Sequence, residues 1–332
     1  MIIETEFTKT FKLKYPIINA PMFLVSDEDL TAASHKAGIM AAMPSLNWRS
    51  SEEFRKALKR TKSLLGDGGS FGVNLIVNKA NPRVPPDLKA CIDEGVPFFI
   101  TSLGSPKEVI KEAHKIGAKV YCDVVNLEYA KKVEDMGADG VIAVSSGAGG
   151  HAGPINPLIL VPYLRKHLKI PVVLAGGVAD GYSMAAALAL GATAVQCGTR
   201  FIAAKEAKVD KNYKDAIVKA KPEDIVMTSR ISGTPAAVIK TPYIEKVGLE
   251  LNPFEKLLLQ YDLTKKWTKM LVSLRGTQML SKAANRTTWK EVWSAGQTVG
   301  LIESVESVQT IVDSMVNECR EAIERSHKHL KL

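Results

Sequence analysis

The sequence lacks paired cysteines, long apolar runs and a signal-peptide core. It contains four cysteines and no CxxC pair; they are Cys91, Cys122, Cys197 and Cys319. We therefore expect reduced, buried thiols in a cytoplasmic protein, not a disulfide framework or a zinc site. No apolar run reaches the roughly 18–20 residues of a membrane span, and the amino-terminal residues contain no signal-peptide core, so no membrane association is expected. Aromatic residues make up only 6% of the chain.

The excess of positive charge is concentrated in one part of the chain. The formal net charge is +9, from 44 basic and 35 acidic residues. Residues 208–290, here called the basic insert, hold 16 basic and 8 acidic residues and so carry +8 alone. The charge is not accompanied by any known RNA-binding or DNA-binding motif, and aromatic residues are not interleaved with the lysines of the insert. We therefore expect no nucleic-acid partner.

Short apolar segments rich in Val and Ile alternate with amphipathic segments of helical period over the first two hundred residues. The eight expected strands are 17–20, 39–42, 71–75, 98–101, 119–124, 140–144, 172–175 and 194–197. Near-continuous apolar strands separated by helices predict a parallel sheet that is covered on both faces. Eight such units favour a (β/α)8 TIM barrel, an α/β fold. A doubly wound sheet is the alternative, but its GxGxxG fingerprint is missing after the first strand.

The barrel is expected to consist of residues 1–207 and 291–332, and the basic insert is expected to be a smaller, mainly helical domain. Within the insert, residues 213–219 and 254–282 have a helical period. Residues 305–329 predict a final helix that returns to the outer ring of the barrel. The sequence leaves the oligomeric state open.

Two glycine-containing loops follow the last two predicted strands. Gly176-Gly177 follows the seventh strand and Gly198-Thr199 follows the eighth. Active sites of such barrels lie at the carboxyl ends of the strands, and these two loops commonly bind phosphate. Backbone N–H groups at a helix start bind anions well where no Cβ intervenes. Each pair alone could simply form a tight turn; the two pairs together predict a phosphate site.

A third loop, residues 145–154, places four glycines around His151. Gly149 and Gly150 allow the backbone to approach a flat ligand closely. His151 is the one histidine of six that lies in such a loop. We expect it to act as a base or as a hydrogen-bond donor. Since no His, Cys or carboxylate lies near it at metal-ligand spacing, no metal site is expected.

Three further strand ends carry candidate residues. Asn74 ends the third strand and Asp123 the fifth. Such a polar side chain can orient the heteroatoms of a cofactor or cap the next helix. Both roles are open for Asn74, whereas capping or a supporting role is expected for Asp123. After the first strand, Pro21-Met22 offers a rigid turn and a soft apolar side chain suited to an aromatic ring.

These segments together resemble the nitronate monooxygenase (2-nitropropane dioxygenase) family. The resemblance is carried in order by YPIINAPM, FGVNL, GAGGHAG, LAGGVADG and AVQCGTRFIAA over residues 15–205, and by WSAGQTVGLI at 293–302. It implies an FMN-dependent barrel with an inserted helical domain. Met22 and Asn74 would then contact the flavin ring, and His151 would face the substrate. The glycines beside the ring would be Gly149 and Gly150, and the ribityl chain and phosphate would be held by Gly176, Gly177, Gln196, Gly198 and Thr199.

The resemblance implies oxidation of alkyl nitronates by oxygen to a carbonyl compound and nitrite. The sequence departs from the family at two places. A Gln and a Glu that many members carry before Gly-Gly-His are here Val144 and Gly147, and a frequent Gly-Arg-Pro is here Gly233-Thr234-Pro235. These changes bear on the substrate rather than on the flavin.

The same architecture also hosts NAD(P)H:quinone reductases and flavin-dependent enoyl-acyl-carrier-protein reductases, so an NAD(P)H-dependent flavin reductase is the alternative. The basic insert is then either a solvated surface or the side that an acidic carrier protein or an NADPH phosphate approaches. Two other classes share part of the pattern. A flavin-binding module without activity would make His151 dispensable, and a phosphosugar isomerase or synthase barrel would share the two phosphate loops.

Overall fold

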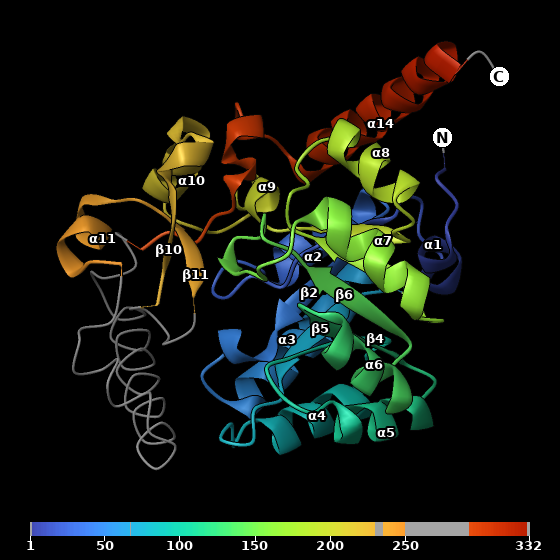
Figure 1. Cartoon of the computed structure of the whole chain (residues 1–332). Helices are drawn as coiled ribbons and strands as arrows, with labels where there is room; N and C mark the ends of the chain where they lie inside the picture. Colours follow the sequence, from blue (N-terminus) through green and yellow to red (C-terminus); the bar gives the residue numbers. More distant parts are fainter. Residues whose placement is uncertain (1, 67, 230–234, 250–291, 331–332) are drawn as a thin grey trace.

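The computed structural model describes residues 2–66, 68–229, 235–249 and 292–330. Eight parallel strands close into a barrel in the order β1-β2-β3-β4-β5-β6-β8-β9 (Figure 1). Their bounds are β1 Ile17–Asn19, β2 Met40–Pro44, β3 Gly72–Ile76, β4 Phe98–Ser102, β5 Lys119–Val124, β6 Gly140–Val144, β8 Val172–Ala175 and β9 Ala194–Cys197. The predicted (β/α)8 barrel is confirmed, and each predicted strand matches to within two residues at either end.

Helices follow the strands and form the outer layer of the barrel. They are α2 Glu28–Lys36, α3 Ser51–Leu65, α4 Val84–Asp93, α5 Lys107–Lys115, α6 Leu127–Asp135, α7 Pro157–His167, α8 Gly181–Ala189 and the short α9 Thr199–Ile202, with the turn η1 Ser45–Asn47 before α3. The carboxyl-terminal helix α14, Val308–Leu330, packs on α8 and α2, so the final helix does return to the outer ring as predicted (Figure 1).

The interior of the barrel is apolar at its amino-terminal end and polar at its carboxyl-terminal end. The helix α1, Glu6–Phe11, packs Phe7 edge-on against Phe98 and Tyr121, with ring centroids 6.0 and 5.9 Å apart. Inward-facing strand residues form one cluster with this helix: Ile18, Met40, Ala42, Phe98, Ile100, Tyr121, Ile142, Val173, Ala175 and Ala194. Side chains alternate along a strand. The inner face at the carboxyl end is therefore lined by Asn74, Ser102, Asp123 and Gln196.

The described part of the basic insert contains strands as well as helices. Its elements are α10 Lys211–Lys219, η2 Pro222–Asp224, β10 Ile225–Thr228, β11 Ala236–Ile239 and α11 Pro242–Val247 (Figure 1). Strand β11 pairs antiparallel with β10 on one side and with β7, Gly150–His151, on the other. We call β7, β10 and β11 the roof sheet. The sequence did not predict these strands, and the helix expected over 254–282 lies outside the described residues.

Residues 293–296, here called the return segment, connect the insert to the barrel. Ser294 forms a bridge with Val238, and the Ile239 amide donates to the Trp293 carbonyl at 2.8 Å. The Tyr213 ring stacks on Trp293 at 5.9 Å, and its hydroxyl donates to the Ser294 carbonyl at 2.5 Å. The chain then forms η3, Gln297–Leu301, before α14. The division into barrel and insert stays a prediction. Across the described ranges, no helix combines the length and the apolar character of a membrane span.

Candidate active site at the carboxyl end of the barrel

His151 is held at the carboxyl end of the barrel by the roof sheet. It lies in the loop after β6, and its register partner across the sheet is Ala236 of β11. The residue has solvent-exposed surface, but the protein atoms around its imidazole desolvate it and lower its pKa below the ordinary value of a histidine. At neutral pH the imidazole is therefore uncharged, with one nitrogen able to donate and the other able to accept.

The loops after β6 and β8 and the return segment meet through glycines. A Cβ on Gly149 would lie 2.7 Å from the amide nitrogen of Gly296, and a Cβ on Gly176 would lie 2.4 Å from that of Ala148. Backbone therefore occupies the space that a side chain would need at both positions. By contrast, Gly150 has a φ of +67° and nothing within 4 Å of its Cβ position, so it borders open space. Gly149 and Gly176 thus have a packing role, and their predicted cofactor role stays a prediction.

The two predicted phosphate loops differ in how their N–H groups are used. Asp180 caps α8, and the Gly177 amide donates to the Gly147 carbonyl at 3.3 Å. At α9 the N-cap is Gly198, and no side chain from residues 2–66, 68–229, 235–249 or 292–330 caps the first turn. The Thr199 hydroxyl oxygen accepts from the Gly296 amide at 3.0 Å, which leaves its proton for another acceptor. The start of α9 is therefore the better placed of the two for an anion.

Met22 lies beside this loop, as the two were expected to share a ligand. Its Sδ is 3.6 Å from the Cβ position of Gly198. The Met22 amide donates to Ser26 Oγ at 2.9 Å, and that hydroxyl donates to the Ala20 carbonyl at 2.8 Å. These bonds fix the turn through Pro21. Met22 is partly buried and so keeps accessible surface.

Two inward-facing amides present acceptor oxygens at the same end of the barrel. The Asn74 Nδ2 group donates to the Ile100 carbonyl at 3.2 Å and to Ser102 Oγ at 2.8 Å, which uses both of its protons. Asn74 caps no helix, because α4 begins only at Val84. The Oε1 atom of Gln196 is buried and has no hydrogen-bond partner among the described residues. A ligand with N–H and O–H donors would satisfy such acceptors.

Asp123 also lies on this inner face. Of the two roles expected for it, capping is wrong, whereas its hydrogen bond to Ser102 is a supporting role. The cap of α6 is Asn126, whose side chain accepts from the Tyr129 amide at 2.9 Å. Asp123 Oδ2 instead accepts from Ser102 Oγ at 2.6 Å, while Oδ1 is buried and has no partner in the part of the chain that the structure describes. Burial raises the pKa of this carboxyl to about 6. The sequence singled out Asp123 as a strand end, but nothing in it showed the link to Ser102.

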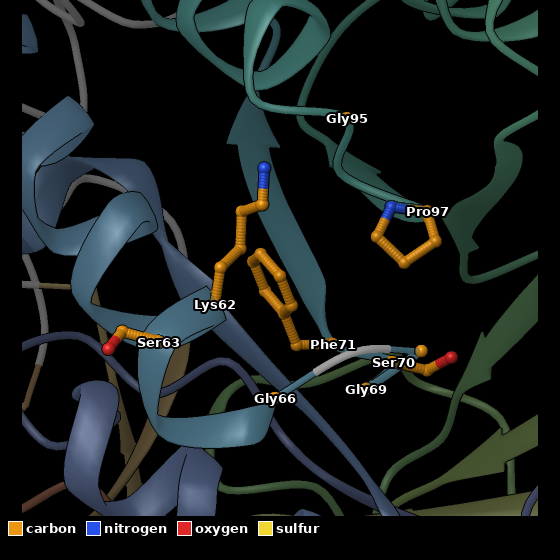
Figure 2. Close-up of a pocket in the computed structure, with 9 residues that line it drawn as sticks. Lys62, Ser63, Gly66, Gly69, Ser70, Phe71, Gly95 and Pro97 are labelled. Carbon is orange, nitrogen blue, oxygen red and sulfur yellow. The ribbon is translucent and has the colours of Figure 1, made fainter.

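A groove at the other end of the barrel contains none of the predicted site residues. Its lining includes Lys62 near the end of α3, and Phe71 and Pro97 from the segments that lead into β3 and β4 (Figure 2). These segments connect helices to the amino-terminal ends of strands, whereas His151 follows the carboxyl end of β6. Lys62 is already occupied, since its Nζ donates to the Glu94 carbonyl at 2.8 Å. The groove is therefore separate from the candidate active site.

A closed parallel barrel with a histidine, glycine loops and unpartnered acceptors at its carboxyl end defines the class of (β/α)8-barrel enzymes. The sequence model of the nitronate monooxygenase family matches residues 4–318. The chain therefore belongs to the nitronate monooxygenase family and is an oxidoreductase of that type.

The relatives of this chain are named for different activities. The chain is 32% identical to FabK from Thermotoga maritima, with a TM-score of 0.84 and coverage of 98% of this chain and 99% of that one. It is 27% identical to a probable nitronate monooxygenase of Staphylococcus saprophyticus, covering 98% of this chain and 100% of the relative. It is also 26% identical to a (3aS,4S,5R,7aS)-5-hydroxy-7a-methyl-1-oxo-octahydro-1H-indene-4-carboxyl-CoA dehydrogenase of Rhodococcus jostii, over 97% of both chains.

Proposed function

We propose that the protein is an FMN-dependent enzyme that oxidises alkyl nitronates with oxygen to a carbonyl compound and nitrite. The observation that carries this proposal is that the groups proposed for catalysis and for cofactor binding lie at one end of the barrel. The roof sheet holds His151 at the same end of the barrel as the inward acceptors of Asn74 and Gln196 and the uncapped start of α9. A cytoplasmic location is part of the proposal, and the burial of all four free cysteines is consistent with it.

The residues at this end fit FMN. The unpartnered Gln196 oxygen suits a ribityl hydroxyl, and the Asn74 oxygen suits the imide N–H of the ring. The start of α9 at Gly198 and Thr199 suits the phosphate, and Met22 suits packing on the ring. When bound, FMN would supply electron transfer between the substrate and oxygen.

His151 would bind the nitro group of the substrate. Because its pKa is lowered, the imidazole is neutral at pH 7 and would donate its N–H to a nitro oxygen of the anionic nitronate. The same neutral ring could instead accept a proton from a nitroalkane. The first role is the one we propose, because a nitronate has already lost its proton.

The variant His151→Asn tests this role. We expect it to bind FMN as the wild type does and to lower kcat with a nitronate by about 10²-fold, the usual size of a lost acid–base or oxyanion contact. The flavin absorption spectrum reports FMN binding independently of turnover. Unchanged turnover in the FMN-loaded variant would show that His151 has no such role.

An NAD(P)H-dependent flavin reductase is the second candidate. It is favoured by the 32% identity to FabK, the highest identity among the relatives compared above, and by the carboxyl-CoA dehydrogenase among them. Val144 and Gly147, where many nitronate monooxygenases carry Gln and Glu, are departures that bear on the substrate. Such an enzyme would act on a quinone or on an acyl thioester.

Anaerobic mixing separates the two candidates. The yellow protein would be mixed separately with NADH, NADPH and a nitronate, and the flavin absorbance followed. Rapid bleaching by NADH or NADPH would favour the reductase. Indifference to both, with nitronate turnover in air, would favour the monooxygenase. A purified protein that neither contains nor takes up flavin would exclude both.

A further inference from the structure

A chain of hydrogen bonds joins three neighbouring strands on the inner face of the barrel. Asn74 of β3 donates to Ser102 Oγ of β4 at 2.8 Å, and Ser102 Oγ donates to Asp123 Oδ2 of β5 at 2.6 Å. The serine has one proton, which goes to the carboxyl group, so it can only accept from Asn74. The direction of the chain therefore fixes which end of the Asn74 amide remains available as an acceptor.

The second oxygen of the Asp123 carboxyl group has no partner within the described residues. Oδ1 is inaccessible to solvent, although the residue as a whole is only partly buried. The causes of its raised pKa are burial, opposed by the Ser102 hydrogen bond, and they include no cation. An unpaired buried carboxylate oxygen is unfavourable. A donor from a bound ligand would remove this cost, since Asp123 faces the same interior as Asn74.

We propose that Asp123 is a cofactor-contacting residue that fixes the Asn74 amide through Ser102 and opposes reduction of the bound flavin when its carboxyl group is ionised. The proposal rests on the FMN site proposed above. A negative charge beside the flavin disfavours added electrons, whereas the neutral acid can donate a hydrogen bond to it. Asp123 would thus contribute to setting the reduction potential.

Few other groups change charge near Asp123. The Cys122 thiol on β5 and the Tyr129 phenol on α6 lie close enough to interact with its charge. The pKa of each is raised, so both are neutral between pH 5 and 8. Ser102 on β4 does not titrate in this range, and neither does Ile142 on β6, the register partner of Asp123. His151 does titrate at the same end of the barrel, so the test below includes the His151→Asn background.

The test measures the affinity for FMN and the midpoint potential of bound FMN at pH 5 and pH 8. At pH 8 we expect Asp123→Asn to raise the potential by about 30 mV, which is a tenfold change in the relative affinity for the reduced and oxidised forms. At pH 5 the carboxyl group is protonated and the two proteins should agree. Ser102→Ala should raise the Kd for FMN about tenfold, because the Asn74 amide loses its fixed orientation.

Thr101→Val is the matched control. Thr101 precedes Ser102 on β4 and is buried, but its hydroxyl donates to Cys122 Sγ at 3.2 Å on the outer face. We expect it to leave both the Kd and the potential unchanged. Equal potentials for wild type and Asp123→Asn at pH 8, or a difference that disappears in the His151→Asn background, would overturn the proposal. A wild-type protein that binds no FMN would instead overturn the proposed function itself.

Discussion

Burial of the Asp123 carboxyl group makes the stability of the protein depend on pH. Its folded-state pKa is about 6, against 3.8 for an unperturbed aspartate. The folded state therefore holds the proton more tightly, and the free energy of unfolding falls as pH rises through this window. Above the window the loss amounts to about 3 kcal/mol, from about 1.4 kcal/mol per pKa unit.

Asp123→Asn should abolish this loss. In FMN-free protein we expect the variant to be more stable than the wild type at pH 8, by about 1–3 kcal/mol, and equally stable near pH 4. Urea unfolding at the two pH values gives both free energies. Equal stabilities at pH 8 would mean that the carboxyl group is not held in the unfavourable environment described here.

The sequence predicted the position of a residue well where the residues next to it along the chain define its local structure. Four glycines around His151 predicted a loop, and the structure finds that loop at the carboxyl end of the barrel. Capping and a supporting role were both expected for Asp123, because an Asx residue shortly before a helix often caps it. Only the supporting role, through Ser102, agrees with the structure. Asn126, three residues later, is the actual cap. A sequence pattern locates the start of a helix only to within a few residues. The Ser102 partner is invisible because it lies on another strand.

At the scale of elements, the contact between the loop after β6 and the return segment depends on glycine. Gly149→Ala would place its Cβ 2.7 Å from the Gly296 amide nitrogen and 2.8 Å from the Ala295 carbonyl carbon. Backbone must move to relieve this contact, so we expect a loss of about 1–3 kcal/mol in the free energy of unfolding. Thermal or urea unfolding of the FMN-free protein measures it.

Gly198→Ala is the control for this prediction. A Cβ at that position would make only an ordinary contact, 3.6 Å from Met22 Sδ, and its φ of −102° is accessible to alanine. Its stability without FMN should stay close to that of the wild type. If both variants were equally stable, the close approach of the loop and the return segment would not contribute to stability.

The barrel strands and the roof sheet differ in how far the sequence specifies them. Each barrel strand is an apolar run with helical segments on either side, so its period is visible locally. Strand β7 is only two residues long, and its partner β11 lies more than eighty residues further along the chain. Pairing between such distant short segments leaves no local pattern. The roof over His151 could therefore be found only in the folded structure.

At the scale of the whole molecule, part of the charge of the basic insert is already paired. Lys208 forms ion pairs with Asp27 and Asp29 near the start of α2, which lie outside the insert and so are not counted in its charge of +8. Exposed pairs of this kind contribute little to stability. They do reduce the positive charge that the described part of the insert offers to a partner, which supports a solvated surface for that part. Net charge alone could not show this.

The candidate FMN site draws on the barrel, the roof sheet and the return segment, so FMN should stabilise the protein as a unit. At a free concentration of 100 times Kd, a ligand that binds only the folded state adds about 2.7 kcal/mol. For a chain of 332 residues we expect a rise in Tm of about 4 °C. Riboflavin, which lacks the phosphate, should give a smaller rise at equal concentration if the start of α9 binds that group. Equal shifts with both ligands would show that the start of α9 does not bind the phosphate. No shift with FMN would show that the protein has no FMN site of the kind proposed.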